Sequence, residues 1–219
     1  MNTYAPTPRT KVRRLAKRGV YDKAVVHSIL DEGLLCHIGF AVEGQPYVIP
    51  TLYARVGEQL YVHGSAVSRM LKTLAEGVDI CITVTLVDAY VLARSAFHHS
   101  MNYRSVVVLG RAQLVTDHAE RLQALRAVTN HIVPGRWEQV REPNELEMRQ
   151  TAVLRLPLEE VSAKVRVGPP NDDAEDYAIP VWAGIVPICT QVGRPLDDGR
   201  VRPDAASLDL SRFTRKAPT

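Results

Sequence analysis

Two hydroxyl groups and two cations lie close together in the sequence, at Ser65, Ser68, Arg69 and Lys72. A strand-like segment ends at Ser65, and a short helix is predicted to begin after Ser68, because serine is a favoured N-cap residue. The start of a helix offers unpaired backbone N–H groups and the positive end of the helix dipole, so these side chains would hold a phosphate at several points. An ordinary capped surface helix would show the same residues. The pattern indicates an anion site and leaves the structural interpretation open.

A further cation, Arg104, stands between Tyr103 and Ser105 at the start of an apolar run, and it is the one Lys, Arg, Asp or Glu between Phe97 and Leu109. An arginine beside a buried strand needs an anionic partner, because an unpaired guanidinium is costly in a low dielectric. That partner is either a carboxylate of the protein or a phosphate of a ligand. The sequence does not choose between them.

Three histidines are candidates for chemistry. His63 ends an alternating strand-like segment, and imidazole exchanges protons near neutral pH, so His63 is the candidate catalytic residue, with a structural role as the alternative. His98 and His99 are adjacent, and neighbours in an extended segment point to opposite sides, so the two do not easily bind one ion. No metal site is predicted.

Known catalytic motifs are missing from the sequence. It contains no nucleophile elbow, Walker loop or dinucleotide-binding glycine motif, and its histidines and cysteines lack the spacing of a zinc hydrolase. The side chains offer no electron carrier, so redox chemistry would have to come from a cofactor such as a flavin.

The chain of 219 residues is long enough for one well-filled core, and we expect one globular domain. The net charge of +3 is unevenly placed, because six basic residues lie in the first twenty: Arg9, Lys11, Arg13, Arg14, Lys17 and Arg18. Such an arm binds nucleic acid or anionic lipid, or is a solvated segment that lies across a partner subunit. The second interpretation is favoured, so nucleic acid is not an expected partner.

The cysteines and the hydropathy predict a soluble, cytoplasmic protein. Cys36, Cys81 and Cys189 are odd in number, widely spaced and without a Cys-x-x-Cys pair, which favours a reducing compartment. No secretory signal follows the basic arm, and no uncharged apolar stretch approaches twenty residues, so no membrane span is expected.

The elements expected to position these residues are mostly strands joined by short, glycine-bearing turns. Strands are predicted at residues 34–42, 47–55, 59–63, 79–92, from 103 onward, 152–156 and 161–167. Helices are predicted at residues 22–32, from Ser68 to a stop at Gly77, from 116 or 117 to 132, and for a turn or two at 145–148. The polar, irregular segment 93–101 is expected to be a functional loop.

This pattern predicts a mainly β fold, a six- or seven-stranded antiparallel β-barrel with a few α-helices, since closure removes exposed strand edges. We expect a basic N-terminal arm at residues 1–20, the barrel domain at 21–188, and an extended or partly disordered tail at 189–219.

Several phrases of the sequence resemble a known superfamily. They are Pro46–Pro50, Leu60–Ser65, Lys72, Tyr103–Gly110, Ser162–Pro170 and Pro180–Pro187. They resemble the flavin-binding split barrels of the pyridoxamine 5'-phosphate oxidase-like superfamily, in the branch with the nitroimidazole-resistance and flavin-nucleotide-binding proteins, over roughly residues 20–190. The arginine- and histidine-rich C-terminal substrate segment of true pyridoxamine 5'-phosphate oxidases is missing, so vitamin B6 oxidation is not expected.

The resemblance implies a homodimer that binds FMN in two clefts at the subunit interface. The ring would be lined by the residues at 50–52, edged by those at 63–65 and stacked by Trp182, while the cations at 69 and 72 would hold the phosphate. The cofactor residues so implied are Pro50, Thr51, Leu52, His63, Gly64, Ser65, Ser68, Arg69, Lys72, Tyr103, Arg104, Ser105 and Trp182.

The function implied by the resemblance is that of an FMN-dependent oxidoreductase that passes electrons to a small organic acceptor, a nitro compound being one example, with NADH or NADPH as the candidate donor. FAD or a deazaflavin in place of FMN stays open, since all three carry a phosphate near the ribityl chain. The alternatives are a flavin-sequestering protein without turnover, and a haem-binding split barrel in which His98 or His99 ligates the iron.

Overall fold

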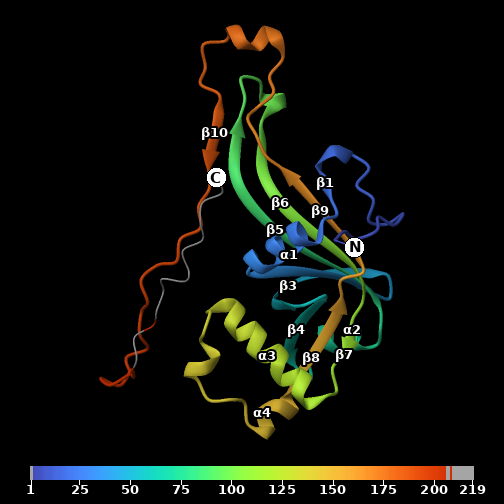
Figure 1. The fold of residues 1–219 in the computed structure, drawn as a ribbon, viewed down its shortest axis with the longest axis vertical. Coiled ribbons are helices and arrows are strands. Elements are labelled where there is room, and N and C mark those ends of the chain that lie inside the picture. The colour runs from blue at the N-terminus through green and yellow to red at the C-terminus, as the bar shows by residue number, and fades with distance from the viewer. Residues whose placement is uncertain (1, 206–207, 209–219) are drawn as a thin grey trace. The chain divides into compact units, whose positions relative to one another are not determined.

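The computed structural model describes residues 2–205 and residue 208, and antiparallel strands dominate this part of the chain (Figure 1). The described residues form ten strands: β1 (Gly19–Val20), β2 (Leu35–Val42), β3 (Gln45–Val56), β4 (Gln59–Ser65), β5 (Asp79–Leu92), β6 (Ser100–Arg111), β7 (Gln113–Leu114), β8 (Thr151–Pro157), β9 (Glu160–Arg166) and β10 (Gly184–Pro187). They also form four α-helices: α1 (Lys23–Glu32), α2 (Arg69–Ala75), α3 (His118–Ile132) and α4 (Glu145–Gln150). Four short 3-10 helices complete the elements: η1 (Ala16–Arg18), η2 (Ala96–His98), η3 (Trp137–Gln139) and η4 (Ala174–Ala178).

The strands form one sheet in the order β1-β9-β6-β5-β2-β3-β4-β8-β7, and β10 pairs with β5. The pairs are antiparallel, from the β2–β3 hairpin to the β4–β8 and β6–β9 pairs. Within the described residues, seven strands have seven residues or more, while β1, β7 and β10 are shorter. The mainly β fold with an antiparallel split barrel is thus confirmed.

The chain forms two compact units. The first unit contains residues up to 87 and residues 102–168, and the second contains residues 88–101 and the chain from 169 onward. The barrel with α1 to α4 belongs to the first unit. The second unit holds η2, η4, β10 and the end of β5 that pairs with β10. The boundaries expected at residues 20 and 188 stay predictions, and positions 206, 207 and 209–219 of the expected tail lie outside the described residues.

Helix α1 closes one side of the barrel core. Asp22 caps it by accepting a hydrogen bond from the backbone N–H of Val25 at 3.1 Å, and Ile29 and Leu30 are buried among the strands. The helix ends at Gly33, where a Cβ atom would collide with the side chain of Val84, so only glycine allows this close approach. The predicted helix at 22–32 is therefore correct.

A second apolar cluster lies outside the main core. Helix α3 packs over β3 and β4 (Figure 1), and its Ala124 and Leu125 are buried in one cluster with Tyr61, Trp137 and Met148. Asp117 caps α3 through a hydrogen bond from the N–H of Glu120 at 2.8 Å. This choice between the two predicted caps follows from the stronger acceptor that a carboxylate provides.

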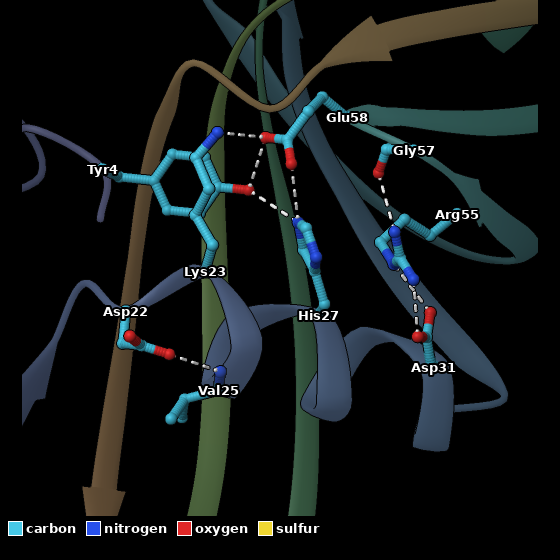
Figure 2. Close-up of polar contacts among 9 residues, drawn as sticks. All are labelled: Tyr4, Asp22, Lys23, Val25, His27, Asp31, Arg55, Gly57 and Glu58. Carbon is cyan, nitrogen blue, oxygen red and sulfur yellow. Dashed lines mark hydrogen bonds and ion pairs between the residues drawn. The ribbon is translucent and has the colours of Figure 1, made fainter. Parts of the chain in front are cut away.

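A cluster of polar side chains anchors the N-terminal segment on α1 and on the β3–β4 turn (Figure 2). Tyr4 is only 5% exposed, and its hydroxyl donates to Glu58 Oε2 at 3.0 Å and lies 3.0 Å from His27 Nε2. Lys23 Nζ donates to the same carboxylate at 3.0 Å and lies 5.0 Å above the Tyr4 ring. We call these four residues, Tyr4, Lys23, His27 and Glu58, the N-terminal cluster.

The N-terminal cluster changes the pKa values of its members. Burial, followed by the hydrogen bond to Glu58, raises the pKa of the Tyr4 hydroxyl. Burial also raises the pKa of Glu58, but the hydrogen bonds from Lys23 and Tyr4 outweigh it, so the pKa of Glu58 is lowered. Burial and the nearby Arg55 guanidinium lower the pKa of His27. The polar side chains of the cluster are thus paired with one another.

Candidate functional site

The short helix α2 is held against β4 at Gly64. A Cβ atom at this glycine would lie 3.1 Å from Leu71 Cδ1, so the missing side chain lets the helix approach the strand. Leu71 and Leu74 enter the barrel core from α2. Ser68 stands at the N-cap position, but its side chain makes no capping hydrogen bond. The predicted helix is correct, and the Ser68 hydroxyl is not used to cap it.

A cavity of about 380 Å³ lies beside α2, and we call it the α2 cavity. The residues that line it are Ala66, Leu71, Lys72, Ala75, Leu114, Val115, Thr116, Arg121, Thr151 and Ala152. Arg121 donates to the backbone carbonyl oxygens of Met148 and, at 2.7 Å, of Thr151. The side chain of Lys72 makes no hydrogen bond or ion pair with any described residue. The cavity thus offers one cation without a protein partner beside one that is fixed by the backbone.

Arg69 does not line the α2 cavity. Its guanidinium carbon lies 4.8 Å from the centroid of the Tyr47 ring, which itself stacks on Phe40 at 5.5 Å and 19°. Such a cation–π contact fixes the side chain without cancelling its charge. The two cations that the sequence placed together, Arg69 and Lys72, therefore have different surroundings.

His63 lies on the face of β4 opposite to Gly64, because side chains alternate along a strand. It pairs across the sheet with Val153 of β8 and does not line the α2 cavity. Its Nδ1 atom is buried and has no hydrogen-bond partner among the described residues. Burial lowers the pKa of His63, so the ring is neutral near pH 7.

The three residues expected along the flavin ring, Pro50, Thr51 and Leu52, do not share a face of β3. Pro50 and Leu52 point with Val48 to an exposed face, and Val48 is 67% exposed. Thr51 points to the opposite face and pairs with the buried Cys36 of β2. Because side chains alternate along a strand, Thr51 lies on a different face from Pro50 and Leu52, although the three residues are adjacent in the sequence.

Arg104 has a carboxylate partner in the protein. Its guanidinium donates two hydrogen bonds to the carboxylate of Glu32 at 2.5 and 2.9 Å, in the bidentate geometry of strong ion pairs. The neighbouring Ser105 hydroxyl lies 3.4 Å from the backbone oxygen of Lys164, and Tyr103 pairs with Arg166 of β9. Of the two partners that the sequence left open for Arg104, the structure shows the carboxylate.

Trp182 belongs to the second unit, where it contributes to an exposed aromatic face. Its indole lies over Gly184, since a Cβ atom there would be 2.9 Å from Trp182 Cζ2, and it is 63% exposed. Tyr90 and Val186 pair directly across β5 and β10, so their exposed side chains share one face of the sheet with Gly184.

The two adjacent histidines are also in the second unit, with different partners. His98 Nε2 lies 3.1 Å from Asp173 Oδ2, whereas His99 Nδ1 lies 2.9 Å from the backbone oxygen of Ser95. One ligand atom each of His98, Asp173 and Asp176 falls within 4.8 Å of the others. This grouping does not require an ion, because the His98 ring already has Asp173 as its partner.

A family model described as pyridoxamine 5'-phosphate oxidase matches residues 22–165, more than half of the chain. The chain belongs to this family. The resemblance read from the sequence is confirmed, and the family model covers most of the split barrel together with the segment 88–101 of the second unit. Among the described residues, none of the helices combines the length and the apolar composition needed to cross a membrane.

Two solved structures resemble nearly the whole chain of this pyridoxamine 5'-phosphate oxidase family member. The flavocytochrome Anf3 from Azotobacter vinelandii is 45% identical, covers 93% of this chain and 95% of its own, and has a TM-score of 0.87. The FAD and haem binding protein from Mycobacterium smegmatis is 33% identical, covers 90% of this chain and 96% of its own, and has a TM-score of 0.84. No curated protein sequence matches the chain.

A third likeness concerns the fold alone. A structure described as a 5-nitroimidazole antibiotic resistance protein from Bacteroides thetaiotaomicron is 24% identical, covers 67% of this chain and 86% of its own, and has a TM-score of 0.57. The family model stops at residue 165, whereas the two longer likenesses cover nine tenths of the chain and so include most of the C-terminal segment beyond it.

Sequence reasoning missed Arg121 and Thr151, which bring polar groups to the α2 cavity. Arg121 lies one turn into α3, far along the chain from Lys72, and only the β4–β8 pairing brings Thr151 opposite Ser65. One indication of this role was present in the sequence: Arg121 lies four residues after the Asp117 cap, on a helix whose other face is apolar.

Proposed function

We propose that this protein binds both a flavin and a haem and works as an electron-transfer protein or oxidoreductase. The observation that carries the proposal is the likeness, over nine tenths of the chain, to the flavocytochrome Anf3 and to the FAD and haem binding protein. A likeness that extends over both compact units is hard to reconcile with a flavin-only function of the barrel.

The flavin phosphate is assigned to the α2 cavity. The ammonium group of Lys72 has no hydrogen-bond or ion-pair partner among the described residues. Arg121, Thr116 and Thr151 bring further polar groups to the same cavity. A cation with adjacent hydroxyls suits a phosphate, which accepts several charge-assisted hydrogen bonds. Arg69 would have to leave the Tyr47 ring to contribute. The residues present therefore fit a flavin nucleotide.

The flavin is proposed to be FAD, which replaces FMN as the first choice because the Mycobacterium relative is described as FAD binding. Both nucleotides carry the phosphate next to the ribityl chain, so Lys72 would serve either. When bound, the isoalloxazine ring supplies one- and two-electron transfer that no side chain of the protein offers.

A second copy of the chain is proposed to cover the exposed face of β2 and β3. Leu35, Val48 and Leu52 are exposed on this face, and Pro50 lies between the last two. An apolar sheet face of this kind is typical of a subunit interface. A homodimer would cover this row, and the predicted ring-lining residues Pro50 and Leu52 would then lie at the interface.

His63 is proposed to orient a substrate or to donate a proton. Its neutral ring carries one N–H donor and one acceptor, and the buried Nδ1 atom has no partner among the described residues. Because His63 does not line the α2 cavity, it would act on the ring side of the cofactor and not on the phosphate. The small organic acceptor, with nitro compounds as one class, and NADH or NADPH as donor stay proposals from the sequence, as does the cytoplasmic location.

The experiment that tests this function is the absorption spectrum of the purified protein, with mass spectrometry of the cofactors that heat releases. We expect flavin bands, a Soret band and a released mass that matches FAD, from a protein that sediments as a dimer. Reduction by NADH or NADPH would identify an oxidoreductase, whereas a holoprotein that neither donor reduces would favour the flavin-sequestering alternative. A protein that contains neither cofactor and takes up neither added FAD nor added haemin would contradict the proposal.

A further inference from the structure

The second unit holds residues 88–101 and the chain from 169 onward. The family model covers residues 22–165, so it includes the segment 88–101 but not the C-terminal segment of this unit. The likenesses to the flavocytochrome and to the FAD and haem binding protein include most of that C-terminal segment, which contacts the segment 88–101 through the Arg94–Asp172 and His98–Asp173 pairs. On the basis of the proposed function, we therefore expect haem ligands in the second unit.

His99 has the hydrogen bonding expected of an iron-ligating histidine. Its Nδ1 atom lies 2.9 Å from the backbone oxygen of Ser95, and a carbonyl oxygen can only accept, so Nδ1 carries the hydrogen. In the neutral ring the lone pair is then on Nε2, which makes no hydrogen bond or ion pair with a described residue. Iron-ligating histidines commonly donate the other ring N–H to a carbonyl or carboxylate, which fixes the tautomer and orients the ring.

His98 is the less suitable neighbour. Its Nε2 atom, the less hindered ring nitrogen, is already 3.1 Å from the carboxylate of Asp173. Ligation by this atom would break that contact and leave Asp173 without its partner. The alternative that the sequence left open between His98 and His99 is thereby narrowed to His99.

The loop that carries His99 is held in place from two sides. The Ser95 side chain accepts a hydrogen bond from the N–H of Phe97 at 3.2 Å, and the Ser95 carbonyl also accepts one from the N–H of His98 at 3.1 Å. Arg94 donates to Asp172 through its backbone N–H and its guanidinium, both at 2.9 Å, and the Asp172 side chain is only 1% exposed. A ligand on so constrained a loop is oriented before the iron binds.

Exposed apolar side chains surround His99 in the sequence and recur in the same unit. Phe97 is 88% exposed, and Met101 is also exposed. The exposed rings of Tyr90 on β5 and of Trp182, two residues before the start of β10, add to the apolar surface of the unit. Large exposed apolar surfaces are unusual in a soluble protein unless a ligand or partner covers them. A porphyrin is a planar apolar ligand of suitable kind, and a second copy of the chain is the competing occupant.

We infer that the second unit is the haem-binding part of the molecule and that His99 would bind the haem iron through Nε2. The test is titration of the full-length protein with haemin, read by the Soret and visible bands and by electron paramagnetic resonance. The variants are His99→Ala, His98→Ala as the matched neighbour, and His99→Gly with added imidazole. Circular dichroism and FAD affinity report whether each variant is folded.

We expect His99→Ala to change the spin state of the iron and to weaken haem binding by more than the roughly 10- to 100-fold that is lost at a metal site when a residue that hydrogen-bonds a ligand is removed. Added imidazole should restore the wild-type spectrum to His99→Gly, and His98→Ala should keep it throughout. A folded His99→Ala protein with the wild-type spectrum and affinity would overturn the inference alone. A wild-type protein that binds FAD but no haemin would overturn the haem part of the proposed function as well, and would leave a second copy as the occupant of the apolar face.

Discussion

The N-terminal cluster and the α2 cavity both contain cations and hydroxyl groups, but they differ in how these groups are paired. In the cluster, the carboxylate of Glu58 accepts hydrogen bonds from Tyr4 and from Lys23, each at 3.0 Å. In the cavity, the ammonium group of Lys72 has no hydrogen-bond or ion-pair partner among the described residues. Polar groups that satisfy one another stabilise a fold, whereas a cation left without a partner beside a cavity is available to a ligand.

Two cations, Arg104 and Lys72, and two histidines, His98 and His99, differ in the same way: in one of each the group that could bind a ligand has a side-chain partner in the protein, and in the other it has none among the described residues. Arg104 is neutralised by Glu32, and His98 is engaged by Asp173, while Lys72 and the Nε2 atom of His99 stay available. Residue type alone predicted all four as candidates for cofactor binding or ligation. Only the pairing tells which of them are occupied by the protein itself.

The N-terminal cluster is expected to stabilise the fold, and its tyrosine gives the largest effect. Tyr4→Ala removes a buried ring and the hydroxyl, and we expect it to lower the free energy of unfolding by about 3–5 kcal/mol. Tyr4→Phe removes only the hydroxyl, and we expect a loss of about 1 kcal/mol. Urea denaturation followed by far-UV circular dichroism measures both.

FAD affinity provides the control for these two variants, since neither Tyr4 nor its partners line the α2 cavity. Both folded proteins should bind FAD as the wild type does. Equal stability of all three proteins, or a selective loss of FAD binding in Tyr4→Phe, would mean that the N-terminal cluster does not serve to stabilise the fold.

The pairing within the N-terminal cluster also predicts a smaller effect, on the pH dependence of stability. Burial and the guanidinium of Arg55 lower the pKa of His27, and the nearby Glu58 and Asp31 carboxylates do not offset this, with Lys23 adding to it. The folded protein therefore prefers the neutral ring, whose contribution to stability is present above the unfolded pKa of about 6.5 and is lost as the pH falls through the lower, folded pKa.

We expect His27→Gln to remove part of the decline in stability that the wild type shows below pH 6.5. Parallel urea denaturations at several pH values check this. Glu58 affects stability at more acidic pH than His27. Its contribution to the free energy of unfolding is lost as the pH falls through its lowered pKa in the folded state. Identical pH profiles for wild type and His27→Gln would show that His27 does not titrate with folding.

Local patterns in the sequence predicted most of the fold. Periodicity and capping placed α1 within one residue of its observed start, and the enrichment in Val, Ile and Thr predicted β5 with its observed bounds, Asp79–Leu92. These signals are local, because each element is decided by its own side chains. The number of long strands followed from the same patterns.

The candidate site was harder to predict because it depends on contacts between distant segments. The prediction that Pro50, Thr51 and Leu52 line one ring did not take into account that side chains alternate along a strand, which turns Thr51 to the other face. The burial of Tyr4 against α1 is likewise not indicated by the residues near it in the sequence. The partner of Arg104 lies 72 residues away, so the choice between carboxylate and phosphate required the structure. Arg121 enters the α2 cavity from α3 for the same reason.

The most direct test of whether the Lys72 ammonium group holds the flavin phosphate is the FAD affinity of Lys72→Ala compared with that of Arg69→Ala. Both variants remove one positive charge from α2, so general electrostatic attraction changes equally. If the cation without a protein partner holds the phosphate, Lys72→Ala should bind FAD at least about tenfold more weakly, in keeping with the energy of a charge-assisted hydrogen bond, and Arg69→Ala should stay within about threefold of the wild type. A Lys72→Ala protein with wild-type affinity would contradict the account, and equal weakening by both variants would return the two-cation site predicted from the sequence.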